Sequence, residues 1–219
     1  MTVLPAAAHP PAPRSRPGPG LSSLKIVLTG PFGVGKTTLV GAVSEIAPVT
    51  TEARLSAAAV EDTTHVPAKT TTTVAMDFGR LSVDGVTVYV YGMPGQDRFW
   101  FMWDALTLGA AGVIVVADTR RLADSFRHVD YVEHARLPFV VAVNQFPGAR
   151  TYPVADLREA LALGPEVPIV DIDARDRDCV RRLLIALIEH TLRTRSGILA
   201  PHTAAVDQHD PTFQPKEHP

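Results

Sequence analysis

A short glycine-rich stretch, residues 30–37, leaves few folds open to this chain. It reads Gly-Pro-Phe-Gly-Val-Gly-Lys-Thr, follows an apolar run of strand length at residues 24–29, and opens a helical pattern at residues 36–47. The pattern G-x-x-x-x-G-K-[ST] between a strand and a helix is typical of a phosphate-binding loop (P-loop), whose backbone N–H groups and helix dipole face phosphate oxygens. The sequence therefore predicts an α/β domain that binds a nucleoside triphosphate or diphosphate.

The rest of the chain alternates between strand and helix patterns. Strands are expected at residues 24–29, 74–83, 86–91, 112–117, 139–144 and 167–172, and helices at residues 36–47, 97–108, 122–134, 154–163 and 176–195. Asp84-Gly85 indicates an antiparallel hairpin. Residues 49–73 form a long polar stretch, with a helical turn or two at residues 53–60. We expect a Ras-like three-layer sandwich with a mostly parallel six-stranded sheet and one antiparallel edge hairpin.

Composition excludes several classes of protein. The 21 Lys and Arg residues nearly balance the 23 Asp and Glu residues, which does not favour nucleic acid or an acidic membrane as the main partner. Cys179 is the one cysteine, which argues against a disulfide framework and a multi-thiolate zinc site. No run approaches the roughly 20 apolar residues that cross a bilayer. We expect a cytoplasmic protein, peripheral at the inner membrane at most through partners.

The two ends differ in composition from the middle. Six of the 19 prolines fall within the first 20 residues, and residues 1–22 are expected to form a disordered proline-rich arm. Residues 199–219 carry four prolines and three histidines, and predict a second disordered tail. Residues 23–198 remain as one domain, long enough to bury a core.

Several segments beyond the loop are similar to the switch regions of small GTPases. Residues 69–78 read KTTTTVAMDF, like a first switch and the strand after it, and residues 95–99 read GQDRF, like a second switch. From residue 24 to about residue 195 the chain resembles the Ras-superfamily small GTPases. The segments TVAMDFG, YGMPGQ, VNQF and DARDR look most like the MglA-related bacterial GTPases of actinomycete conservons, the CvnD type.

This resemblance implies a GTP/GDP-binding switch that uses Mg²⁺. Thr37 and Thr73 would hold the metal ion, with Thr72 as the alternative to Thr73 within the threonine run, and Gln96 would orient the attacking water. Lys36 would reach the β- and γ-phosphates. The nucleotide contacts that the resemblance implies come from Gly30, Pro31, Phe32, Gly33, Val34, Gly35, Lys36, Thr37, Thr38, Gly95, Asn144, Gln145, Ala174 and Arg175.

Two positions depart from the family pattern near the phosphates. Gly92 replaces the aspartate that usually supports Mg²⁺, so hydrolysis should be slow unless Asp77, Asp97 or water substitutes. Phe32 replaces a small glycine and crowds the path of an activator's arginine finger. Arg54 becomes a candidate for an intrinsic finger; the alternative is that it is a solvated loop residue.

The base-reading motif departs as well. Asn-Lys-x-Asp appears as Asn144-Gln145-Phe146-Pro147, and proline cannot accept the hydrogen bonds that an aspartate takes from guanine. Ala174 and Arg175 resemble the Ser-Ala-Lys loop whose backbone N–H meets the guanine oxygen. GTP therefore remains the expected ligand through family resemblance rather than through chemistry.

The expected helix at residues 97–108 is rich in aromatic residues. One face can bury Phe99, Met102, Trp103 and Leu106, which turns Trp100 and Phe101 outward as anchors for a partner protein. A wide core stripe is the alternative. In the family that this chain resembles, the partners are a roadblock-type small protein and a histidine-kinase-like sensor.

The main hypothesis is a nucleotide-dependent switch with slow GTP hydrolysis. Gln96 and Thr73 favour this enzyme, whereas Gly92 and Pro147 favour a non-hydrolysing interaction module. An ATP-binding P-loop protein, such as a small-molecule kinase, is a further alternative. A kinase lid would need several phosphate-clamping arginines, and residues 49–73 contain Arg54 alone.

Overall fold

The structure is a computed structural model that describes residues 23–47, 49–54, 73–83 and 85–196. For residues 49–54, 73–75, 97 and 98 it describes the backbone alone. The expected arm at residues 1–22 and most of the polar stretch at residues 49–73 lie outside these ranges, as does the tail at residues 199–219. No helix within the described ranges is long and apolar enough to cross a membrane.

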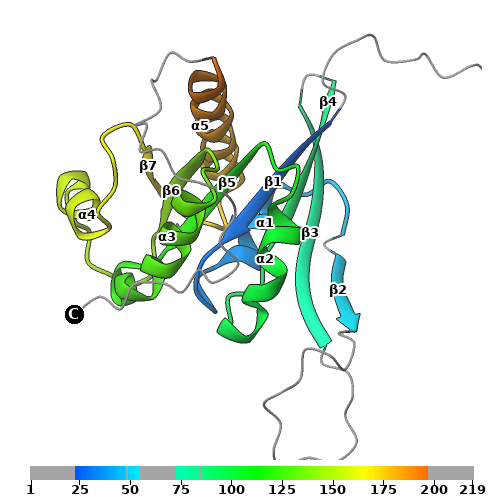
Figure 1. Cartoon of the computed structure of the whole chain (residues 1–219), viewed down its shortest axis with the longest axis horizontal. Coiled ribbons are helices and arrows are strands. Elements are labelled where there is room, and N and C mark those ends of the chain that lie inside the picture. The colour runs from blue at the N-terminus through cyan, green and yellow to red at the C-terminus, as the bar shows by residue number, and fades with distance from the viewer. Residues whose placement is uncertain (1–22, 48, 55–72, 84, 197–219) are drawn as a thin grey trace, which may run out of the picture.

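A mixed sheet forms the centre of the domain (Figure 1). Its strands are β1 (Ser23–Thr29), β2 (Val49–Arg54), β3 (Thr73–Val83), β4 (Val86–Gly92), β5 (Gly112–Ala117), β6 (Phe139–Asn144) and β7 (Ile169–Ile172). Their order is β2-β3-β4-β1-β5-β6-β7. The neighbours β4–β1, β1–β5, β5–β6 and β6–β7 pair in parallel, whereas β2–β3 and β3–β4 are antiparallel. The expected α/β fold class is confirmed.

Strand β2 is the element that sequence reasoning did not predict. It pairs with the outer side of β3, from Val49 opposite Phe78 to Arg54 opposite Thr73, so the hairpin does not form the sheet edge. The helical turn expected from residue 53 is wrong for residues 53 and 54, which lie in this strand. An edge strand satisfies its backbone through one neighbour and needs no apolar face, which is why hydrophobic periodicity did not predict it.

Helices cover both faces of the sheet (Figure 1). The α-helices are α1 (Lys36–Val43), α2 (Trp103–Thr107), α3 (Phe126–His134), α4 (Val154–Ala160) and α5 (Arg177–Arg195), and two 3₁₀ segments are η2 (Asp97–Met102) and η3 (Thr119–Ser125). Side chains of α1 and α5 pack with Ile26 and Leu28 of β1. Those of α2, α3 and α4 pack on the other face with Val27. Alternation along one strand thus builds two cores.

Helix α5 illustrates how the sequence fixes a local element. Asp176 caps its start, because the carboxylate accepts hydrogen bonds from the N–H groups of Asp178 at 2.8 Å and Cys179 at 3.2 Å. The apolar stripe that faces the sheet includes Leu183 and Leu187, both buried. Leu192, which continues the same helical spacing, is 57% exposed near the end of the helix. The periodicity therefore predicts the helix better than the extent of its buried face.

The segment after β4 begins as a 3₁₀ helix rather than as the expected α-helix. In a 3₁₀ helix residues three apart eclipse one another, so Trp100 lies over Trp103 with 4.7 Å between ring centroids. Trp100 is consequently half-buried, and the expectation that it turns outward is wrong. Phe101 is 54% exposed, as expected. The prediction assumed α-helical spacing, and the 3₁₀ spacing places the Trp100 ring against Trp103 instead.

The sheet topology gathers several chain reversals at one edge. Because β1, β5, β6 and β7 run parallel, their carboxyl ends meet there, and open α/β sheets bind ligands at that edge. The glycine-rich loop follows β1 and packs against β5. A Cβ atom on Gly30, whose φ is +143°, would lie 2.3 Å from the Val116 carbonyl oxygen. Only glycine lets the loop leave β1 this close to its neighbour.

Substitution of Trp103 by alanine should lower the free energy of unfolding by about 3–5 kcal/mol. The indole is 1% exposed and contacts the rings of Trp100, His128 and Tyr131. Phe101→Ala, on the same segment, is the matched control and should cost less than about 1 kcal/mol. Urea unfolding followed by circular dichroism measures both. Equal losses for the two variants would contradict this packing.

Candidate functional site

The side chain of Lys36 folds back onto the glycine-rich loop and bonds its backbone. Its Nζ donates hydrogen bonds to the carbonyl oxygens of Gly30 at 2.6 Å and Pro31 at 2.7 Å, and the side chain is 8% exposed. Burial lowers the pKa of Lys36 to about 8, although the nearby carboxylate of Asp77 raises it. An ammonium group with few water contacts is therefore available at the mouth of the loop.

Asn144 fastens the back of the same loop. Its Nδ2 donates to the Val34 carbonyl at 3.0 Å, and its Oδ1 accepts from the Ala174 N–H at 3.0 Å. The side chain is 5% exposed. Gly35 makes this approach possible, since its φ is +105° and a Cβ there would lie 2.5 Å from Asn144 Nδ2. One amide thus joins the loop, the end of β6 and the segment after β7.

The threonine after Lys36 is linked to a carboxylate from β3. Thr37 Oγ1 donates to Asp77 Oδ2 at 2.7 Å. Asp77 lies opposite Gly92 in the antiparallel ladder, and a Cβ on Gly92 would lie 3.0 Å from Asp77 Oδ2. Asp77 therefore fills the space beside Gly92, the position where the resembled family has an aspartate. Asp77 is thus one of the substitutes considered that the fold brings to Thr37, while the side chain of Asp97 lies outside the description.

Two hard oxygen donors side by side suit Mg²⁺. This ion prefers oxygen ligands, keeps several waters, and commonly takes one or two protein groups together with substrate phosphates. Among the described residues no group of three His, Cys, Asp or Glu side chains could hold a metal ion by itself. The pair of Thr37 and Asp77 thus fits Mg²⁺ that arrives with a phosphate ligand, rather than a metal ion caged by protein alone.

The segment after β4 lies directly against the loop. The Met93 N–H donates to the Leu28 carbonyl at 2.8 Å, which holds the chain beside the end of β1. A Cβ on Gly95 would lie 2.5 Å from the Gly30 carbonyl oxygen and 2.7 Å from the Phe32 nitrogen. Gln96 follows in extended conformation and precedes the 3₁₀ segment η2. Gly95 thus lies against the loop and Gln96 is the next residue along the chain, while their expected roles in phosphate binding and hydrolysis stay predictions.

The other two expected catalytic residues lie opposite one another. Arg54 and Thr73 are register partners at the last pair of the β2–β3 ladder. Their backbones are described, while their side chains are outside the description, as are all atoms of Thr72. Their expected roles therefore stay predictions.

The end of β1 is fixed from α3 as well. Thr29 Oγ1 and His128 Nδ1 are 2.8 Å apart, and both side chains are buried. Burial, with the charges of Lys36 and Arg127, lowers the pKa of His128 well below its usual value, so the ring is neutral near pH 7. The same ring stacks on Trp103. A buried contact chain thus joins the residue before the loop to helix α2.

The segment expected to read the base offers few guanine-specific groups. Gln145 Nε2 donates to Asp171 Oδ1 at 3.1 Å, and Pro147 is exposed. The Ala174 N–H, expected to meet the base, donates to Asn144 instead. Arg175 forms a 2.8 Å ion pair with Asp173, and its hydrogen bonds lower the pKa of Asp173 to about 2.

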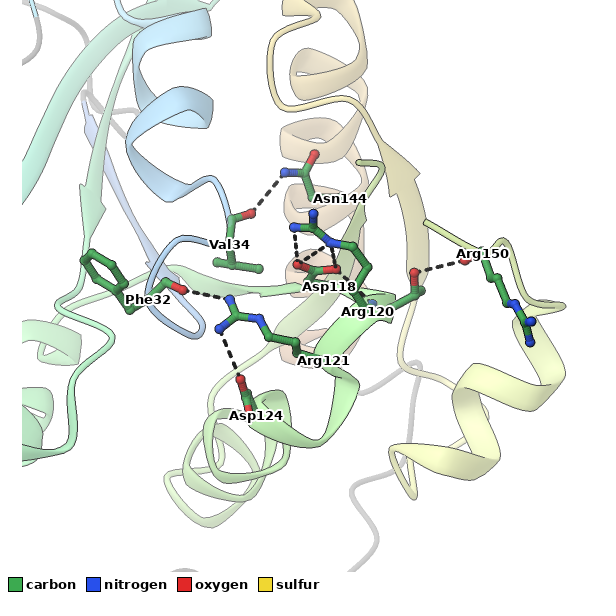
Figure 2. Close-up of polar contacts among 9 residues, drawn as sticks. Phe32, Val34, Asp118, Arg120, Arg121, Asp124, Asn144 and Arg150 are labelled. Carbon is green, nitrogen blue, oxygen red and sulfur yellow. Dashed lines mark hydrogen bonds and ion pairs between the residues drawn. The ribbon is translucent and has the colours of Figure 1, made fainter. Parts of the chain in front are cut away.

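Sequence reasoning missed a cluster at the end of β5 (Figure 2). Asp118 is buried and accepts hydrogen bonds from the Arg120 Nε and Nη2 atoms and backbone N–H. Burial alone would raise the pKa of Asp118, but these bonds and the charge of Arg120 outweigh it and hold the pKa below its usual value. The Arg120 guanidinium lies 3.8 Å from the ring centroid of Phe146. The sequence signal that indicates this cluster is Asp-Thr-Arg-Arg, residues 118–121, at the carboxyl end of an apolar strand.

The family of the chain follows from comparison with known proteins. A family model described as a conserved hypothetical ATP binding protein matches residues 28–194, from β1 into α5. The chain belongs to this family. An uncharacterised protein of Methanocaldococcus jannaschii is 26% identical over 124 residues, which are 56% of this chain and 70% of that protein. This is a nucleotide-binding P-loop protein.

Solved structures support the fold of this P-loop protein. The G domain of the T. maritima FeoB iron transporter matches with a TM-score of 0.52 at 20% identity, over 77% of this chain and 98% of that domain. The FeoB G-domain from Methanococcus jannaschii gives 0.53 at 17% identity, over 78% and 99%. The T. maritima FeoB cytosolic domain in a GDP form gives 0.57 at 20% identity over 78% of this chain, which spans 64% of that domain. These identities support a G-domain-like fold alone.

Replacement of Asn144 by alanine should destabilise the protein by about 2–4 kcal/mol. The change leaves the Val34 carbonyl and the Ala174 N–H buried without this partner, at about 1–3 kcal/mol each. Gln145→Ala is the matched control, since it removes one exposed hydrogen bond from the next residue along the chain. Denaturant unfolding compares the two. A loss for Asn144→Ala no larger than for Gln145→Ala would contradict the fastening role.

Proposed function

We propose that this protein binds a purine nucleoside triphosphate with Mg²⁺ and hydrolyses it slowly. The observation that carries the proposal is the pairing of Thr37 with Asp77 at 2.7 Å, beside a lysine held inside a glycine-rich loop. The family description, an ATP binding protein, supports a nucleotide ligand. The loop supplies backbone N–H groups for phosphate oxygens, and Lys36 supplies the positive charge.

Thr37 and Asp77 would hold Mg²⁺ in this proposal, with Thr73 as a further ligand from the first switch. A bound Mg²⁺ neutralises charge that develops on the phosphates. Asp77 lies on β3, four residues after Thr73, so one strand would carry both groups. The absence of an aspartate at Gly92 then need not weaken the metal site, because its space belongs to Asp77.

Gln96 would orient the attacking water, and Lys36 would stabilise charge on the transferred phosphoryl group. Arg54, opposite Thr73 in the ladder, would act as an intrinsic arginine finger.

The second candidate function is a nucleotide-binding module without turnover. Gly95 favours it in one respect, because the backbone there lies against Gly30 and Phe32. A phosphoryl group at that point requires the two segments to separate.

This contact also supports a switching role. A terminal phosphate that displaces Gly95 would move η2, whose Phe101 is exposed, against α2, whose Trp103 is buried in the core. Phe101 is the side chain that a partner would sense. The resemblance to conservon GTPases suggests a roadblock-type small protein and a histidine-kinase-like sensor as such partners.

The proposed ligand includes both ATP and GTP. Guanine recognition needs a carboxylate acceptor for the base N–H groups, and Pro147 provides none. The Ala174 N–H, the second guanine contact, is used by Asn144. GTP remains the ligand that the family resemblance favours, and ATP the one that the family description names.

Asp77→Asn should reduce the gain in nucleotide affinity on adding Mg²⁺ by roughly ten- to hundredfold. The substitution removes the negative charge and leaves the side-chain volume. Titration calorimetry with the β,γ-imido analogues of ATP and GTP, with Mg²⁺ and with EDTA, measures this gain. Glu159→Gln, on the exposed side of α4, is the charge-matched control. An unchanged Mg²⁺-dependent gain in Asp77→Asn would exclude this carboxylate from the metal site.

Single-turnover hydrolysis distinguishes the two candidate functions. We expect slow phosphate release from both ATP and GTP, with affinities within about tenfold of each other, because a discriminating base contact is missing. Gln96→Leu should abolish release while it leaves nucleotide binding intact. Binding without release at any Mg²⁺ concentration would favour the module without turnover. No binding of either nucleotide would refute the proposal.

A further inference from the structure

Arg121 reaches the glycine-rich loop from the end of β5 (Figure 2). Its Nη2 donates a hydrogen bond to the Phe32 carbonyl oxygen at 2.9 Å, across 89 positions of sequence. Within the segment η3 the backbone of Arg121 departs from helical geometry, with φ −148° and ψ 50°. This departure interrupts the short helical turn at the residue whose side chain meets the loop.

The hydrogen bond acts on one peptide unit of the loop. A trans peptide is planar, so its carbonyl and its N–H point in opposite directions. The described chain has no cis peptide bond, and the peptide unit whose carbonyl accepts from Arg121 joins Phe32 to Gly33. Fixing the Phe32 carbonyl toward Arg121 therefore aims the Gly33 N–H to the opposite side. A donor with a full charge also polarises the peptide and makes that N–H a stronger donor.

The next-but-one peptide unit of the loop is held in the same manner. Asn144 Nδ2 donates to the Val34 carbonyl at 3.0 Å, which aims the Gly35 N–H away from Asn144. Two side chains from different strand ends thus fix alternate peptide units. Figure 2 shows both contacts, with the Phe32 ring on the side of its backbone opposite to Arg121. Asn144 is buried, whereas Arg121 keeps about half of its side chain exposed.

The carboxylate beside the Arg121 guanidinium does not cancel its charge toward the loop. Arg121 Nη1 lies 3.5 Å from Asp124 Oδ2, and the two side chains are 49% and 51% exposed. An exposed pair of this kind contributes little energy, so Asp124 orients the arginine without neutralising its effect on the loop. A Cβ built on Gly33 would lie 4.0 Å from Arg121 Nη2, which places the charge beside the glycine.

We propose that Arg121 is a positioning residue for polyphosphate binding, which fixes the Phe32–Gly33 peptide so that the Gly33 N–H faces the phosphates. The inference rests on the proposed function and adds to it a residue that acts through the loop rather than on the ligand. Its contribution belongs to the phosphates and not to the base. Arg121 should therefore affect triphosphate affinity and leave nucleoside affinity unchanged.

Arg121→Ala should weaken binding of the Mg²⁺ complexes of both β,γ-imido analogues by roughly tenfold, the effect of one charge-assisted hydrogen bond. Arg121→Lys keeps the charge and should restore part of the affinity. Arg181→Ala, on an exposed position of α5, is the matched control. Calorimetry gives the affinities, and adenosine and guanosine serve as ligands without phosphate. The Tm of Arg121→Ala should stay close to that of the wild type, because the side chain is half-exposed.

A second measurement tests the loop itself. The amide proton of Gly33 should shift upfield in the ¹H–¹⁵N spectrum of ligand-free Arg121→Ala, since the peptide loses its polarising partner, while Arg181→Ala leaves it unchanged. Wild-type affinity in Arg121→Ala, or an equal loss of nucleoside and triphosphate affinity, would overturn the positioning role. A wild-type protein that binds neither analogue would instead refute the proposed function, and the Gly33 shift would still report on the loop.

Discussion

The hydrogen bonds of Asn144 are the interaction on which the site depends. One buried amide group accepts from the segment after β7 and donates to the loop after β1, so three chain segments far apart in sequence share one fixed point. The packing of Asn144 against Gly35 leaves no room for a side chain on that glycine. Because an unpaired buried amide is costly, the three segments keep their positions together or lose them together. The shape of the phosphate-binding loop is thus a property of the whole sheet edge.

The carboxylate beside Thr37 comes from β3 rather than from the end of β4. In the family that the sequence resembles, the aspartate lies at the end of the strand that here ends in Gly92. The antiparallel ladder places Asp77 opposite that glycine, and the small residue leaves room for its side chain. In the proposed function, Asp77 takes the place of the aspartate that Gly92 replaces. This exchange ties the site to β3, the strand that also carries Thr73.

Sequence reasoning predicted the elements that hydrophobic periodicity encodes. The buried strands β1, β5 and β6 and helix α5 appear where their apolar patterns indicate. The edge strand β2 was missed, because backbone pairing with β3 rather than an apolar pattern defines it. Trp100 was misplaced for a different reason. A 3₁₀ turn changes which residues share a face, and no composition signal distinguishes it from an α-helical turn.

By itself the amino-acid sequence determined the phosphate-binding loop, since glycines and a lysine at fixed spacing are local chemistry. It also determined the α/β fold class through alternating apolar strands and helices. Only the tertiary structure decided which side chains surround that loop. Asp77, Arg121 and Asn144 lie 40, 89 and 110 positions from the loop residues that they contact. Sheet register and strand order set those meetings, and both depend on the packing of the entire domain rather than on any local pattern.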